Sequence, residues 1–197
     1  VDPSTGKAFR VYYENRNLRG IVAWDPRNIC YQTRRMFWQV SLDEGVTWSD
    51  PKQLICRGDA FDETNWAPGV EHGINSTVIS TKPFLVDDAG RMALPYNMPI
   101  RFGDTIHDPA VPEAQSSPDG DHQFASGVFF ASWSGDELVW DMGEAVTLDR
   151  TQSCDGADEP SIAPLPDGRW FMVLRARRFE NTGQTAPPQH YYAISHD

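Results

Sequence analysis

Two short sequence patterns recur in alternation along this chain, and their order constrains the fold more than any other feature. One is a turn that ends in glycine and is followed by a basic residue and an apolar strand; it occurs at residues 5–9, 89–94 and 167–173. The other begins with a serine-led turn containing Asp; it occurs at residues 41–48 and 134–140 and starts again at 195–197. Because ordered recurrence indicates a repeated structural unit, the sequence predicts a repeat architecture.

The second pattern is fullest at residues 41–48, Ser-Leu-Asp-Glu-Gly-Val-Thr-Trp. We expect the carboxylate of Asp43 to accept hydrogen bonds from turn amides, and Gly45 to adopt a positive φ. We also expect Trp48 to pack back over the turn. Alternating strands flank these residues, which predicts a hairpin.

A weaker copy of this turn at residues 134–140 is one residue shorter. It places Asp136 and Trp140 where the first copy has its Asp and Trp. We interpret Asp43 and Asp136 as structural turn carboxylates on outer hairpins rather than as catalytic groups.

Each repeat therefore contains an inner and an outer hairpin, which together make a four-stranded antiparallel sheet. Such sheets bury both faces when they are stacked radially, so the sequence predicts an all-β fold of the β-propeller type. A β-sandwich with coincidental turns is the alternative. The chain is expected to be a single partial propeller domain, residues 1–197, with three blades at about 1–57, 75–148 and 155–197. Two polar, Gly- and Pro-rich stretches at residues 57–75 and 100–123 are expected to be long loops at a blade edge.

Composition and charge exclude several classes of function. The net charge of −11 repels phosphate backbones, so nucleic acid is not an expected partner. No apolar run reaches the roughly 18 residues of a membrane span. The three cysteines, Cys30, Cys56 and Cys154, have no metal-binding spacing, and we expect no metal. A Cys30–Cys56 disulfide and buried free thiols both remain open.

Ser41, Asp43, Gly45 and Trp48 match the Asp-box (bacterial neuraminidase repeat), and the order of segments resembles bacterial sialidases. The stretch 68–74 with 90–95, and the stretch 159–162 with 165–169 and 175, strengthen the resemblance. The resemblance covers nearly the entire chain and places it on blades two, three and most of four of a six-bladed propeller. It implies a secreted or periplasmic glycoside hydrolase that needs no cofactor and removes terminal sialic acid or a related acidic sugar from a glycan.

The mechanism that this resemblance implies uses three arginines on the substrate carboxylate, an Asp acid/base, and a Tyr nucleophile activated by a Glu. Glu159 matches the activating Glu and Arg175 matches the second arginine. The other two arginines, the Asp and the Tyr have no matching position in this chain, so the isolated chain is expected to be inactive.

Glu159 and Arg175 also form a pair on geometric grounds. Each lies eight positions from Asp167, at the centre of a turn, and residues equidistant from a turn face each other about 5 Å apart across an antiparallel hairpin. A carboxylate beside a guanidinium stays ionised, and the guanidinium fork fits a sugar carboxylate. The alternative is a cross-strand ion pair that sets the register.

Two further residues are candidate substrate contacts. Arg177 shares a strand face with Arg175, and the loop that contains His72 is expected to border the pocket. A non-catalytic propeller that binds glycan or protein is an alternative function, as is a polysaccharide lyase in which His72 would act. Open faces at the two ends of the stack predict self-association of the isolated chain.

Overall fold

The computed structural model describes residues 5–17, 32–70, 78–79, 85–87, 90–101, 122–149, 152–153, 156–176 and 189–196. Within these ranges every regular element is a β-strand, in agreement with the all-β prediction. The strands are β1 (Ala8–Asn17), β2 (Gln32–Ser41), β3 (Lys52–Gln53), β4 (Val78–Ile79), β5 (Leu85–Val86), β6 (Met92–Arg101), β7 (His122–Ser134), β8 (Glu137–Met142), β9 (Asp158–Pro164), β10 (Trp170–Ala176) and β11 (Gln189–Ile194).

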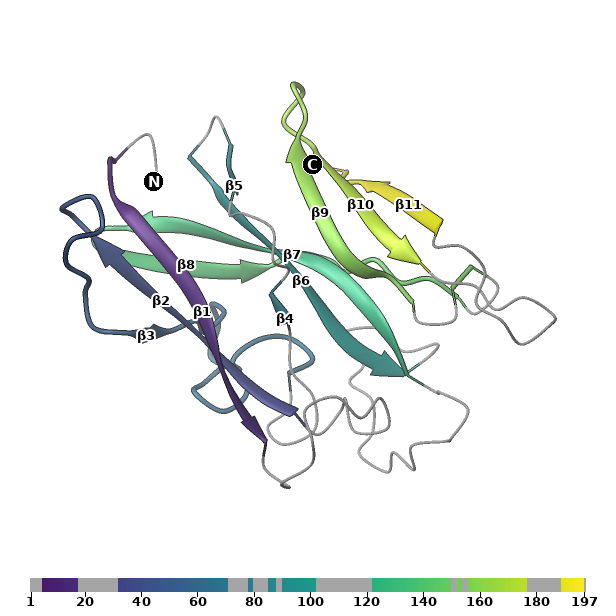
Figure 1. The fold of residues 1–197 in the computed structure, drawn as a ribbon, viewed down its shortest axis with the longest axis horizontal. Coiled ribbons are helices and arrows are strands. Elements are labelled where there is room, and N and C mark those ends of the chain that lie inside the picture. Colours follow the sequence, from purple (N-terminus) through teal and green to yellow (C-terminus); the bar gives the residue numbers. More distant parts are fainter. Residues whose placement is uncertain are drawn as a thin grey trace.

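The strands form three antiparallel sheets that follow one another in chain order (Figure 1). The first sheet has the order β1-β2-β3, and the third has the order β11-β10-β9. The middle sheet has the order β4-β6-β7-β8, with β5 also pairing with β6. Strands of each sheet that are consecutive along the chain mostly pair with each other, which is the pattern of hairpins joined by turns.

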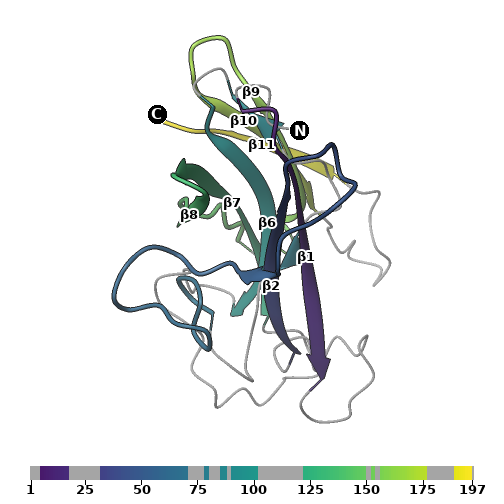
Figure 2. The same cartoon turned by 90° about the vertical axis from the view of Figure 1, so that its left-hand side faces the viewer.

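The sheets pack face to face, and the middle sheet is covered on both faces. Successive side chains of a strand point to opposite faces, and β6 shows this directly. Met92, Leu94 and Tyr96 pack in one core with residues of β2, whereas Ala93 packs in a second core with residues of β10. Figure 2 shows β1 and β2 running lengthwise beside β6. Burial of both faces explains why β6 and β7 carry long apolar runs.

The glycine turns predicted before the apolar strands have the same hydrogen bonds in the middle and third sheets. Gly90 donates its N–H to the carbonyl of Asp87 at 2.9 Å, and Gly168 donates to Leu165 at 3.0 Å. Both glycines have positive φ, 78° and 88°, which only glycine adopts without crowding of a Cβ. For these two of the three copies, the recurrence seen in the sequence is therefore a recurrence of local structure.

The second copy of the serine-led turn differs from the prediction. β7 continues to Ser134, which pairs directly with Glu137, so the turn contains two residues, Gly135 and Asp136. The side chain of Asp136 is 97% exposed and pairs with Lys7 Nζ at 3.1 Å. Trp140 lies in β8 and is buried in the core instead of folding over the turn. The expectation that Asp136 and Trp140 repeat the first turn is wrong, because a two-residue turn is too short to wrap around a carboxylate.

Cys56 is a buried free thiol. Burial, with a smaller contribution from the charge of Asp141, raises its pKa to about 12. Cys30 and Cys154 lie outside the described residues. In the part of the chain that the structure describes, no helix is long and apolar enough to span a membrane.

Candidate functional site

The hairpin of β9 and β10 holds the predicted pair, and a β-bulge changes its register. Trp170 pairs with Pro164, and Val173 pairs with Ser161. In both pairs the two residues are equally far from Asp167 along the chain, as predicted. The register then shifts, and Arg175 pairs with Asp158 rather than with Glu159. The predicted opposition of Glu159 and Arg175 is therefore wrong by one residue.

The bulge lies at a proline. Pro160 has no N–H to donate to the β-ladder, and proline occurs in sheets at bulges or edges. Glu159 precedes it and adopts φ +47°, in the left-handed region that favours glycine. A non-glycine residue in this region costs about 1–2 kcal/mol and occurs often at functional sites.

Despite the shift, Glu159 and Arg175 are in contact. Arg175 Nη2 lies 3.2 Å from Glu159 Oε1, and the Glu159 side chain is 62% exposed. The guanidinium of Arg175 is mostly buried. On its other side, β11 places His190 opposite Arg175 in the strand register. The pair thus offers an exposed carboxylate beside an anchored guanidinium.

Asp158 is the residue of this site that sequence reasoning missed. Its Oδ2 accepts a hydrogen bond from Arg175 Nη2, and its side chain is only 8% exposed. Its Oδ1 accepts hydrogen bonds from Asn97 Nδ2 and, at 2.8 Å, from the backbone N–H of Glu159. The sequence holds no sufficient signal for it: Pro160 lies at the bulge, but Pro95 and Pro99 lie in β6, whose register with β7 is regular.

Elsewhere, the turn at residues 41–48 has the hydrogen bonds expected from its sequence. Asp43 Oδ1 accepts from the N–H of Thr47 at 2.8 Å and from Ser41 Oγ at 2.7 Å, and Oδ2 accepts from Thr47 Oγ1 at 2.6 Å. The hydroxyl and N–H of Thr47, followed by Ser41, lower the pKa of Asp43 to about 2. Gly45 has φ +92°, and Trp48 Nε1 donates to the Gly45 carbonyl at 3.0 Å. Both oxygens of the Asp43 carboxylate accept hydrogen bonds within the turn, which agrees with a structural role.

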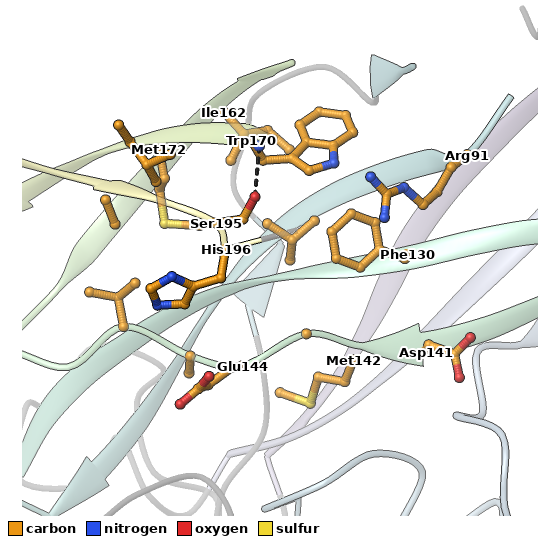
Figure 3. Close-up of a pocket in the computed structure, with 16 residues that line it drawn as sticks. Arg91, Phe130, Asp141, Met142, Glu144, Ile162, Trp170, Met172, Ser195 and His196 are labelled. Carbon is orange, nitrogen blue, oxygen red and sulfur yellow. Dashed lines mark hydrogen bonds between the residues drawn. The ribbon is translucent and has the colours of Figure 1, made fainter. Parts of the chain in front are cut away.

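A groove of about 820 Å³ lies between the middle and third sheets. Figure 3 shows Arg91 beside Phe130 and Trp170 at one end, and His196 and Glu144 at the other. The guanidinium of Arg91 lies 4.8 Å from the centre of the Phe130 ring, and its Nε donates to Asp87. Neither Glu159 nor Arg175 lines this groove, so it is separate from their site.

Two predicted site residues, His72 and Arg177, lie outside the described residues. Among the residues that the structure describes, no group of three or more His, Cys, Asp or Glu side chains is placed to hold a metal ion. The site brought together by the fold consists of Asn97, Asp158, Glu159 and Arg175.

No protein-family model matches this chain, and the search of curated proteins finds no match.

Proposed function

We propose that this chain is part of a sialidase-like exo-glycosidase of β-propeller fold that hydrolyses a terminal sialic acid or a related acidic sugar. The observation that carries the proposal is the contact between the exposed carboxylate of Glu159 and the guanidinium of Arg175, 3.2 Å apart. Arg175 would bind the sugar carboxylate, and Glu159 would take the proton from a tyrosine nucleophile.

The chemistry of each group suits its role. Arginine presents a planar fork of donors that matches a carboxylate, and its charge persists at all working pH values. The carboxylate of Glu159 is an acceptor that can take the proton from a hydroxyl nucleophile. Local positive charge is needed here because the chain as a whole carries a net charge of −11 and repels an anionic sugar.

The propeller form of the fold is supported by the stacking of the sheets. Three antiparallel sheets follow one another, and the middle one has a buried core on each face. Radial stacking of small antiparallel sheets is the arrangement in which every sheet is covered in this way.

Hydrolysis of a fluorogenic sialoside by the full-length protein that contains this chain tests the proposal. We expect Glu159→Gln to lower kcat by about 100-fold or more, because the nucleophile loses its base. Arg175→Lys is expected to raise KM, since a point charge replaces the fork. Glu144→Gln, which removes another exposed carboxylate away from the pair, is the matched control and is expected to leave turnover unchanged.

The same assay distinguishes a second candidate, a non-catalytic propeller that binds acidic glycans. This candidate would be preferred if the sequence that flanks this chain lacked the acid/base Asp, the Tyr or the other two arginines. Binding of sialic acid without turnover in the full-length protein would support it. Turnover that is undiminished in Glu159→Gln would contradict the assignment of Glu159.

A further inference from the structure

We propose that Asp158 is the positioning residue of this site: its buried carboxylate holds the guanidinium of Arg175 in place. The importance of this role for substrate binding rests on the proposed function. The role itself depends only on the geometry of Asp158, Glu159 and Arg175.

Both oxygens of Asp158 are engaged, by groups from three strands. Oδ2 accepts from Arg175 of β10, and Oδ1 accepts from Asn97 of β6 and from the N–H of Glu159 in β9. The carboxylate therefore ties the hairpin of the third sheet to the middle sheet. It also accepts a hydrogen bond from the N–H of Glu159, the residue with the left-handed backbone conformation.

Arg175 lies between two carboxylates that differ in burial. The Asp158 side chain is 8% exposed, whereas that of Glu159 is 62% exposed. Water and salt screen an exposed ion pair strongly, and an exposed side chain loses entropy when it is held in one place. Of the two carboxylates, Asp158 therefore contributes more than Glu159 to the direction of the Arg175 guanidinium.

Loss of the Asp158 carboxylate has two opposing effects on an anionic ligand. Removing a negative charge near Arg175 favours binding through simple electrostatics. Releasing the guanidinium disfavours binding, because Arg175 then loses the hydrogen bond from its Nη2 to Asp158 and must be ordered again when the ligand binds. If Asp158 positions Arg175, the second effect is the larger one.

Asp158→Asn and Glu159→Gln make a matched pair for the test, because each removes one negative charge beside Arg175. The measurement is the Kd of N-acetylneuraminic acid for the full-length protein and both variants, by NMR titration. We expect Asp158→Asn to weaken binding by about tenfold, the scale of one charged hydrogen bond, and Glu159→Gln to leave it equal or tighter. Equal or tighter binding by Asp158→Asn would overturn the proposal.

A second measurement needs no ligand and separates this proposal from the proposed function. Rotation of the Arg175 guanidinium, followed by NMR of labelled Nη atoms, is expected to be slow in the wild type and in Glu159→Gln and fast in Asp158→Asn. Slow rotation in all three proteins would contradict the positioning role. If the wild type neither binds nor cleaves sialosides but this NMR pattern holds, the proposed function fails and the positioning role stands.

Should Asp158→Asn fail to fold, as judged by circular dichroism, Asn97→Ala takes its place. That variant keeps both carboxylates and removes one hydrogen bond to Asp158. Faster guanidinium rotation in Asn97→Ala supports the role, and rotation as slow as in the wild type opposes it.

Discussion

At the scale of single residues, the backbone of Glu159 is the feature with the clearest energetic consequence. Its φ of +47° brings a Cβ close to a carbonyl oxygen, a crowding that glycine avoids. The ion pair between Glu159 and Arg175 offsets little of this conformational cost, since ion pairs with an exposed partner contribute about 0–1 kcal/mol to stability. A strained residue that stabilises the fold so little is more easily explained by function than by folding.

We therefore expect Glu159→Gly to stabilise the protein. The free energy of unfolding should rise by about 1 kcal/mol, because glycine relieves the left-handed strain. Urea denaturation followed by tryptophan fluorescence measures this change. Glu159→Ala is the control, since it also removes the carboxylate but keeps the Cβ; it should be less stable than Glu159→Gly. An Ala variant as stable as the Gly variant would show that the strain is not the cause.

At the scale of elements, the entry to β9 is held by a close approach of two backbones. Gly156 has φ +78°, and a Cβ built on it would lie 2.3 Å from the carbonyl oxygen of Phe124 in β7. The next residue, Ala157, donates its N–H to that same oxygen at 2.7 Å. Only glycine fits where the start of β9 meets β7, and this contact determines where Asp158 begins its strand.

Gly156→Ala is accordingly expected to destabilise the protein by about 3 kcal/mol or more, from positive φ and steric overlap together. Gly135→Ala is the matched control, because Gly135 also has positive φ but no atom lies within 4 Å of the position that a Cβ would take there. The free energy of unfolding of Gly135→Ala should fall by only about 1 kcal/mol. Thermal unfolding of both proteins measures the difference. Equal losses would mean that the approach to β7 is looser than the structure indicates.

At the scale of the whole molecule, the third sheet has an edge strand among the strands that the structure describes. β11 is the outermost strand of the third sheet, and its Tyr192 is 72% exposed. Open strand edges that carry apolar side chains pair readily with other chains. This edge adds to the open faces at the two ends of the stack, from which we expect the isolated chain to associate with itself.

Self-association through this edge predicts a specific effect of Tyr192→Lys. A lysine on the edge strand opposes pairing, so the association constant should fall by about tenfold relative to the wild type. Sedimentation velocity over a range of concentrations measures it. Val46→Lys adds the same charge at a residue that is 80% exposed in the turn after β2. This variant is expected to leave the association constant unchanged. A fall of the same size in Val46→Lys would point to net charge rather than to the edge.

How far the sequence predicts this site can be judged at Glu159 and Arg175. Counting from the turn placed the two residues in the same part of the hairpin, because the β-ladder is regular from Pro164 to Ser161, but it was wrong to place them opposite each other. The count missed Asp158 because a bulge adds one residue to one strand only. A similar limit applies at Asp136, where a short Ser-Gly-Asp stretch resembles the earlier turn but forms a two-residue hairpin loop.

The sequence by itself determined the all-β character, the glycine turns and the local network around Asp43. These features depend on residues close together along the chain, where side-chain chemistry and allowed φ values act directly. The tertiary structure decided which carboxylate Arg175 faces and how deeply each is buried. Those properties depend on contacts from other sheets, such as Asn97 on Asp158 and Phe124 against Gly156, and these arise only when distant strands pack together.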